Sequence, residues 1–377
     1  MGKFATRGHP AAQRLVERAI ESGRPPHALL LVGPEGIGKT TLAFDLAAGL
    51  LCLAAEPGVR PCRECAACRK LEHGNHPDVH VLAPEGAGQQ IRIGQVQQLA
   101  ADLSLLPLEG RFRIGIVEKA HRLNDDAQNA LLKTLEEPPA RVVLILAADD
   151  VARLLPTVIS RCTRVRLGPV SPEEVSAILA ARGVADAARG AALARLTGGR
   201  PGAALALAAS SDAVIAQGRL ARTLLDLLSA SRRRRLTAQS ELIEDGAALV
   251  SAAGGVAAFD ESNAEAQRPQ PKARARSGTS VRRASPAERR AAVTQVLAVW
   301  RDVARDLAVA ARGGRRELRQ HDLLDELAMA GERVDAAQVA RFAQRIDDVS
   351  RAVDAYANPE LALDVLLLEW PTLPSAA

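Results

Sequence analysis

The sequence predicts an α/β protein built on a parallel sheet, followed by a helical C-terminal region. Two apolar runs, Ile114–Val117 and Val142–Ala147, have the length and β-branched content of buried strands. The stretch between them, Asp125 to Glu137, carries a helical apolar stripe, with Asn124 as its N-cap and Pro138-Pro139 as its stop. A strand, a helix and a strand in this order predict parallel pairing, because the connecting helix carries the chain back to the starting edge.

Length and composition set the broad class. A chain of 377 residues is too long for one compact domain, so two or three are expected. Aromatic residues make up only 2%, and the cores must therefore be built from Leu, Val, Ile and Ala. The net charge of +5 permits nucleic-acid contact. The sequence shows neither an apolar run near the roughly 20 residues of a membrane span nor an apolar signal core, so a cytoplasmic protein is expected.

A phosphate-binding motif lies near the N-terminus. A lead-in helix is expected over His9 to Ser22 and a short buried strand over Ala28–Val32. The segment GPEGIGKT, Gly33 to Thr40, then satisfies G-x-x-x-x-G-K-[ST] and precedes a helical run, Thr40–Cys52. This placement between a strand and a helix is the context that the motif requires.

Each residue type in this loop has a physical role. Glycines let successive backbone N–H groups turn inward toward phosphate oxygens, and the helix N-terminus adds partial positive charge. Lys39 is placed for the β- and γ-phosphates, and the Thr40 hydroxyl for Mg²⁺. The candidate ATP- and Mg²⁺-binding residues are Gly33, Pro34, Glu35, Gly36, Ile37, Gly38, Lys39, Thr40 and Thr41. The alternative is a Gly-rich turn without a ligand, or a vestigial loop.

Four cysteines follow at the spacing C-x₉-C-x₂-C-x₂-C, namely Cys52, Cys62, Cys65 and Cys68. Four thiolates at these separations are able to wrap one tetrahedral Zn²⁺, and such a closed site is structural because it leaves no open position. A disulfide is disfavoured in a cytosolic protein, whereas a [4Fe–4S] cluster is allowed by the ligand count alone. The fifth cysteine, Cys162, lies outside the set and is expected to be a small buried residue.

Two further motifs identify a family. NALLKTLEEPP (Asn129–Pro139) followed by LLPTVISRC (Leu154–Cys162) resembles the clamp-loader branch of the AAA+ ATPases, found in bacteria as subunits of DNA polymerase III. IRIGQVQQL, which begins the helical stretch Ile91–Leu106, resembles a helix of the same family. The resemblance implies an AAA+ P-loop sheet with a helical lid and an all-α collar domain. It also favours a structural zinc module over the iron–sulfur alternative.

The strand Ile114–Val117 stands where the family has its Walker B strand. In active AAA+ members this strand ends with the pair Asp-Glu. The Asp orders Mg²⁺, and the Glu polarises the attacking water. Here Glu118 keeps a degenerate Walker B carboxylate, but Lys119 replaces the second acid and is unable to act as that base. Ala148-Asp149 stands where relatives carry polar sensor residues, and Gly202 where they carry a sensor arginine, with Arg200 close by. These departures imply ATP binding with weak or no hydrolysis, and leave enzymatic activity open.

Ser160-Arg161-Cys162 keeps the family pattern in full. The resemblance implies that Arg161 reaches across a subunit boundary to the γ-phosphate of ATP held by a neighbour. A guanidinium suits this task because it is always charged and binds phosphate in a bidentate manner. The implied partners are γ/τ and δ clamp-loader subunits in a hetero-pentamer, with the sliding clamp and primer–template DNA contacted through the complex. The implied place of work is the nucleoid-associated replisome, with no membrane.

Domain boundaries follow from changes of pattern. We expect a nucleotide-binding domain at 1–168 with the cysteine module at 52–68, a helical lid at 169–210, and a helical collar domain at 211–377. Ser171-Pro172 has the signature of a helix start at the lid. A basic, apolar-poor insertion of about 260–288 is expected to be disordered, with eight Lys and Arg against one acid between Arg268 and Arg290.

The C-terminal region offers fewer signals. The arginine run Arg232–Arg235 indicates either DNA contact or a solvated helix end. The final stretch, Ala357–Pro371, resembles the family's terminal collar helix, in which Leu361, Leu363 and Val365 to Leu367 serve packing and assembly.

Two alternative functions stay open. One is a γ/τ-type ATPase motor, favoured by the intact loop and disfavoured by Lys119. The other is a zinc-dependent nucleic-acid-binding module, although the cysteine cluster lacks interleaved aromatics and basic helices. The sequence shows no paired aspartates for nucleotidyl transfer, so polymerase chemistry by this chain is not expected.

Overall fold

The computed structural model describes residues 2–84, 90–261 and 285–373 of the chain. They form two compact units. The first holds residues up to Ile178 together with Gly199–Ala203, and the second holds Leu179–Gly198, Ala204–Glu261 and the C-terminal helices. Each unit is described by itself below.

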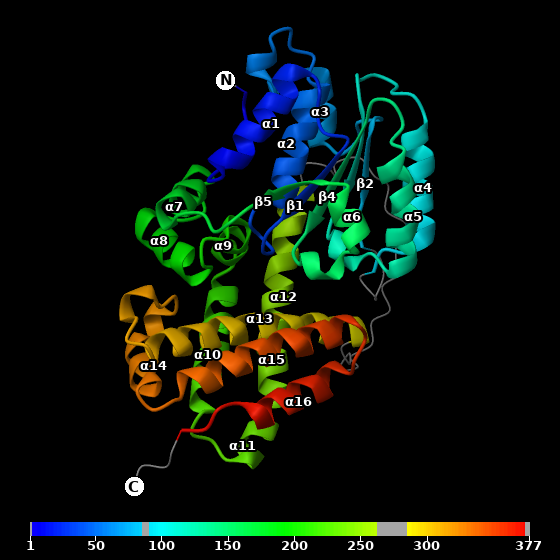
Figure 1. Cartoon of the computed structure of the whole chain (residues 1–377). Coiled ribbons are helices and arrows are strands. Elements are labelled where there is room, and N and C mark those ends of the chain that lie inside the picture. Colours follow the sequence, from blue (N-terminus) through cyan, green and yellow to red (C-terminus); the bar gives the residue numbers. More distant parts are fainter. Residues whose placement is uncertain (1, 85–89, 262–284, 374–377) are drawn as a thin grey trace, which may run out of the picture. The chain divides into compact units, whose positions relative to one another are not determined.

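A parallel five-stranded sheet forms the centre of the first unit (Figure 1). Its strands are β1 (Ala28–Val32), β2 (Val79–Leu82), β3 (Arg113–Val117), β4 (Val142–Ala148) and β5 (Thr163–Arg166). Their spatial order is β2-β3-β4-β1-β5, and every neighbouring pair is parallel. In the register of the central pair Val32 lies opposite Ala148, so the two strands end side by side. The predicted α/β class with a parallel sheet is confirmed.

Helices cover both faces of this sheet (Figure 1). They are α1 (Pro10–Ser22), α2 (Lys39–Leu51), α3 (Ala66–Glu72), α4 (Ile93–Ser104), α5 (Asp125–Glu136) and α6 (Pro156–Ser160), with short 3₁₀ turns at η1 (Pro57–Val59), η2 (Ala120–Arg122) and η3 (Val151–Arg153). The α5 helix begins where predicted, because the Asn124 side chain accepts a hydrogen bond from the Ala127 amide. Leucines of α4 and α5 pack with Leu30 and Leu144 of the sheet in one buried cluster.

From Pro172 onward, every element in the described residues is a helix. The chain continues through α7 (Pro172–Ala181), α8 (Ala187–Leu196), α9 (Pro201–Ala208), α10 (Ser211–Asp226), α11 (Arg232–Thr237) and α12 (Gln239–Glu261). After the undescribed residues come α13 (Pro286–Ala310), η4 (Arg315–Glu317), η5 (His321–Leu323), α14 (Leu324–Gly331), α15 (Ala336–Asp354) and α16 (Pro359–Glu369). A search of the described helices for one long and apolar enough to cross a membrane finds none.

The second unit gathers aromatic residues from three helices into its core. Trp300 of α13, Phe342 of α15 and Trp370, just past α16, lie with ring centroids 4.7 to 5.5 Å apart. The edge-on and tilted angles of these pairs are those that aromatic quadrupoles favour. In α16, Leu363, Leu366 and Leu367 are fully buried, as expected for packing residues, whereas Leu361 is exposed.

The predicted insertion at about 260–288 falls mostly on residues 262–284, which lie outside the described part of the chain. The helix that follows it begins earlier than the predicted boundary at about 288. Ser285 caps α13 and Glu288 completes a capping box with it, so these residues are part of a helix start.

The prediction for the arginine run Arg232–Arg235 is wrong for its last member, because Arg235 is only 2% exposed. It is neither a DNA contact nor a solvated helix end. Its guanidinium donates only to backbone carbonyls, those of Leu228, Ala230, Leu367, Trp370 and Pro371. Several of these carbonyls belong to the C-terminal end of α16, where a cation is favoured by the helix dipole. Arg235 therefore fastens α16 to the start of α11.

We expect Arg235→Leu to destabilise the helical unit by roughly 3 kcal/mol, because several buried carbonyls lose their donor. The chain's two tryptophans, Trp300 and Trp370, are both buried in this unit. Tryptophan fluorescence during urea unfolding of the full chain therefore reports this unit alone. Arg234→Leu is the matched control, since Arg234 is exposed and pairs with Glu241 on the surface. Equal midpoints for the two variants would contradict the fastening role.

Candidate functional site

The Gly-rich loop lies between β1 and α2, as the motif predicts. Gly36 and Gly38 have positive φ angles of 76° and 103°, a backbone that glycine adopts without strain. The helix α2 begins at Lys39, directly after Gly38. On the other side of the loop, a ring nitrogen of the buried His9 lies 2.9 Å from the Ile37 carbonyl oxygen. The nine predicted ATP-contacting residues, 33–41, therefore lie in the loop after β1 and at the start of α2.

The lysine of this loop is already paired. The Lys39 ammonium lies 2.6 Å from a carboxylate oxygen of Asp149 and donates to the carbonyls of Gly33 and Pro34, at 2.7 and 2.8 Å. Its side chain is 8% exposed, so the ion pair is largely shielded from solvent. The partner comes from the end of β4, next to β1 in the sheet. A nucleotide phosphate that reached Lys39 would have to displace this carboxylate.

A second ion pair crosses the same loop. Lys119 follows Glu118 at the end of β3, and its ammonium lies 2.8 Å from a carboxylate oxygen of Glu35. Burial alone would raise the pKa of Glu35, but the Lys119 charge lowers it below its ordinary value. Burial raises the pKa of Glu118, the degenerate Walker B acid, despite the neighbouring lysine. The position predicted for a water-activating acid thus holds a cation that pairs with the loop residue Glu35.

His121 lies beside the same carboxylate. One ring nitrogen is 3.7 Å from an Asp149 oxygen, and the other accepts a hydrogen bond from the Asp149 amide at 3.2 Å. Burial lowers the pKa of His121 to about 4, in spite of the nearby Asp149 carboxylate. The imidazole is therefore neutral near pH 7, and Lys39 supplies the opposing charge for Asp149.

The tip of the loop is covered by the start of α9. The Gly202 amide donates to the Gly36 carbonyl at 2.7 Å. A Cβ at Gly202 would lie 3.0 Å from that oxygen and 3.1 Å from the Gly36 Cα, a spacing tighter than ordinary van der Waals contact. Glycine at this position lets two backbones meet, and a side chain there would push them apart. Arg200 lies two residues earlier and makes interactions of its own.

Arg161 lies on the surface at the C-terminal end of α6. Its guanidinium lies 2.7 Å from a carboxylate oxygen of Glu136, the last residue of α5, and donates to the Thr157 carbonyl at 2.9 Å. The side chain is 35% exposed. The neighbouring Cys162 is partly buried against the sheet core, and burial raises the pKa of its thiol to about 11. The expectation of a small buried cysteine therefore holds only in part, because the side chain is partly buried.

The four predicted metal ligands come together. The sulfur atoms of Cys52, Cys62, Cys65 and Cys68 all lie within 4.8 Å of one another. Tetrahedral zinc with Zn–S bonds of about 2.3 Å requires sulfur separations of about 3.8 Å. The pair Cys62 and Cys68, at 4.0 Å, is close to that spacing. Backbone amides of Cys62, Cys65 and Cys68 point at ligand sulfurs, which favours the thiolate form. The donor set therefore fits a zinc ion.

Comparison with known proteins places this domain. Residues 8–171 match the family described as "DNA polymerase III, delta subunit". This stretch belongs to the clamp-loader family. The chain is 42% identical over 156 residues to DNA polymerase III subunit delta' of Pseudomonas aeruginosa, across 41% of this chain and 47% of that protein. Subunit delta' of Escherichia coli is 38% identical over 200 residues, across 52% of this chain and 59% of the relative.

Subunit tau of Escherichia coli is almost as similar, at 36% identity over 158 residues, which cover 41% of this chain and 24% of tau. Identity alone therefore does not separate a delta' role from a gamma/tau role. The chain spans about half the length of the curated relatives it matches first.

Several contacts around the Gly-rich loop were not predicted from the sequence. Asp149 was noted as an unusual sensor residue but not as the partner of Lys39, and Glu35 was grouped with the phosphate-binding residues. The available signal was positional. Asp149 directly follows β4, and Gly33 directly follows β1, so neighbouring parallel strands place the two ends side by side.

Proposed function

We propose that the chain is a delta'-type subunit of a DNA polymerase III clamp loader, which helps to load a sliding clamp on primed DNA. In this proposal residues 1–168 form the nucleotide-loop domain, 169–210 a lid, and 211–377 a collar that packs with γ/τ and δ subunits. The chain itself does not drive the cycle. Its part is to hold its place in the ring and to act on a neighbour's nucleotide.

The closed state of its own loop carries this proposal. Lys39 is neutralised by Asp149, Lys119 is paired with Glu35, and the Gly36 carbonyl is covered by the Gly202 amide. The first contact occupies the ammonium that a nucleoside triphosphate would need, and the other two hold the loop in place. Where Mg²⁺-ATP does bind, Thr40 and Glu118 would hold the metal and Gly33 to Lys39 the phosphates. Lys119 offers no base for the attacking water.

Arg161 supports a role toward a neighbour. A partly exposed guanidinium held by one surface carboxylate and one carbonyl is free to exchange partners, because such an ion pair is worth about 0–1 kcal/mol. A γ-phosphate would offer it a stronger, bidentate contact. We assign Arg161 the role of an arginine finger in trans.

The cysteine module supports a structural role for zinc. The module follows α2, the helix that starts at the loop, and a bound ion would tie Cys52 at the end of α2 to Cys65 at the start of α3. Arg63, inside the module, pairs with the buried Asp45 of α2. The same Asp45 accepts the backbone amides of Ala5 and Thr6. The module thus braces the N-terminal side of the loop domain.

A rigid apolar loop after α4 supports protein partners. Leu105, Leu106 and Leu108 are 59%, 80% and 72% exposed. Their backbone is nevertheless fixed, because the buried Asp78 carboxylate accepts three amides of residues 108–110, and Arg113 donates to the Leu106 carbonyl. Exposed leucines on a fixed backbone are typical of a docking surface.

ATP binding by the purified chain tests the closed-loop proposal. We expect weak binding of Mg²⁺-ATP and no measurable turnover. Asp149→Asn should tighten ATP binding about tenfold, because it removes the carboxylate charge that competes with phosphate for Lys39. Such a change corresponds to about 1.4 kcal/mol of binding free energy. Titration calorimetry with a steady-state hydrolysis assay measures both properties.

Asp150→Asn is the matched control, since Asp150 is the adjacent acid and caps only the turn η3. Unchanged affinity in Asp149→Asn would contradict the blocking role of the carboxylate. Turnover by the unaltered chain would favour the γ/τ-type motor, which the intact Gly33–Thr40 sequence also supports.

A further inference from the structure

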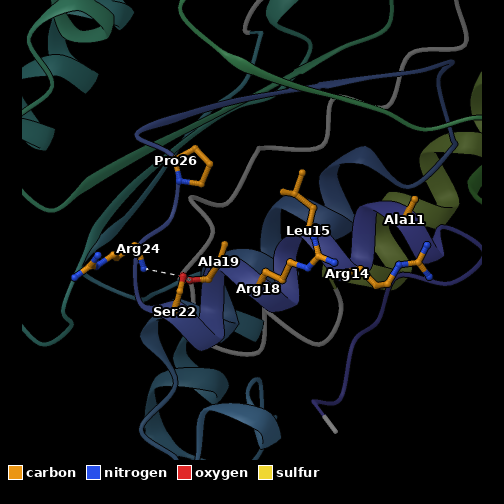
Figure 2. Close-up of a pocket in the computed structure, with 8 residues that line it drawn as sticks. All are labelled: Ala11, Arg14, Leu15, Arg18, Ala19, Ser22, Arg24 and Pro26. Atoms are coloured by element: carbon orange, nitrogen blue, oxygen red, sulfur yellow. Dashed lines mark hydrogen bonds between the residues drawn. The ribbon is translucent and has the colours of Figure 1, made fainter.

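A cavity of about 420 Å³ lies along α1 (Figure 2), and its lining includes no residue of the nucleotide loop or of the cysteine cluster. The residues that line it are Ala11, Arg14, Leu15, Arg18, Ala19, Ser22, Arg24 and Pro26. They combine an apolar floor with arginines. All belong to α1 or to the segment that leads from it to β1, so the cavity is built by one continuous stretch of chain.

The three arginines of this lining are exposed. In the described part of the chain, Arg14, Arg18 and Arg24 make no side-chain ion pair. Arg14 and Arg18 are spaced i,i+4, where like charges destabilise a helix. The acids of α1, Glu17 and Glu21, line a different hollow together with Pro57 and Arg60. Glu17 and Glu21 follow Arg14 and Arg18 at i,i+3, but only the arginines line the larger cavity.

The arrangement of charge fits an extended anionic chain better than a single phosphate. Figure 2 shows Arg14 and Arg18 extending in the same direction along α1, with Arg24 at the opposite end beyond Ser22. The rise between residues 14 and 18 is about 6 Å at 1.5 Å per residue. Guanidiniums spread along a groove in this way meet successive negative groups, whereas one phosphate requires donors that converge.

The floor of the cavity discriminates between two kinds of extended anion. Leu15, Ala19 and Pro26 offer an apolar surface, which favours a partner that buries apolar side chains. The lining residues include no aromatic ring, and such rings are what single-stranded nucleic acids stack on. The chain's own basic segment, residues 262–284, has the wrong charge to fill the cavity.

We propose that this groove binds an acidic segment of a partner protein, in which apolar residues alternate with Asp and Glu. Carboxylates of the segment pair with Arg14, Arg18 and Arg24, and an apolar side chain packs on Leu15 and Pro26. The contact is independent of nucleotide binding and of the proposed clamp-loader role, because it uses none of the residues assigned to either.

The test uses the full chain and a fluorescein-labelled peptide of Asp and Glu with interspersed leucines. We expect anisotropy to show binding that weakens with added salt. Arg14→Glu with Arg18→Glu should weaken it by about tenfold or more, since charge-assisted hydrogen bonds are lost and like charges are introduced. The control is Arg232→Glu with Arg233→Glu, which alters an equally exposed arginine pair in the other unit and should leave binding unchanged.

A second variant guards against misfolding. Arg14→Gln with Arg18→Gln removes charge without reversing it, and circular dichroism should show the same helix content and melting as the unaltered chain. Absence of peptide binding would overturn the proposal, and so would equal loss in the control pair. Binding of labelled oligothymidylate in place of the peptide, lost in the same Arg14 and Arg18 variants, would overturn it in favour of nucleic acid.

Discussion

Arg161→Ala is expected to slow ATP turnover at the site it completes by on the order of 10³-fold, the value of an arginine finger in phosphoryl transfer. The chain itself should fold and assemble normally. The Arg161 guanidinium contacts only Glu136 and the Thr157 carbonyl, at the surface of the domain. Loss of a surface ion pair costs at most about 1 kcal/mol. The defect should therefore appear only in the complex reconstituted with γ/τ and δ subunits.

Single-turnover hydrolysis by that complex measures the effect. Arg161→Lys should be almost as slow as Arg161→Ala, because an ammonium lacks the planar pair of donors. Arg164→Ala is the matched control, since Arg164 is an exposed arginine of the adjacent strand β5 and lies outside the Ser160-Arg161-Cys162 motif. Unchanged turnover with Arg161→Ala, in a complex of normal composition, would sink the finger role.

Features whose partners are close in the sequence were predictable. The N-cap of α5, the Gly-rich turn and the cysteine cluster all depend on contacts over a few residues or on one turn of chain. Cys62, Cys65 and Cys68 lie within seven consecutive positions, so almost any compact path brings their sulfurs together. The sheet was predictable for a related reason, because apolar β-branched runs between helices leave few arrangements other than parallel strands.

Features whose partners meet only in the folded chain could not be predicted from the sequence. Lys39 and Asp149 are 110 positions apart, and their pairing depends on β4 lying beside β1. An intact motif therefore predicted an open phosphate site, although the fold brings a competing carboxylate to its lysine. Arg235 is a similar case. A run of four arginines suggests solvent or DNA, and only the position of α16 turns its last member inward.

Removal of the cysteine-bound metal is expected to have the largest effect on the first unit. We expect about one zinc per chain in the purified protein, by ligand count. Cys62→Ser should abolish stoichiometric zinc. Structural zinc sites contribute roughly 10–16 kcal/mol of binding free energy to small domains, and the segment between α2 and α3 has little core of its own. It should then become open to proteolysis, while Arg63 loses its fixed contact with Asp45.

The helical unit provides an internal reference for this experiment. Both tryptophans lie there, so their fluorescence should be unchanged in Cys62→Ser while elemental analysis shows the loss of zinc. Cys162→Ser is the matched control, because that thiol lies in the SRC motif, outside the cluster. Zinc-free, protease-resistant protein would refute a structural metal. If the protein instead contained iron and absorbed visible light, the four cysteines would remain ligands, but of an iron–sulfur cluster. Four thiolates alone do not distinguish zinc from such a cluster.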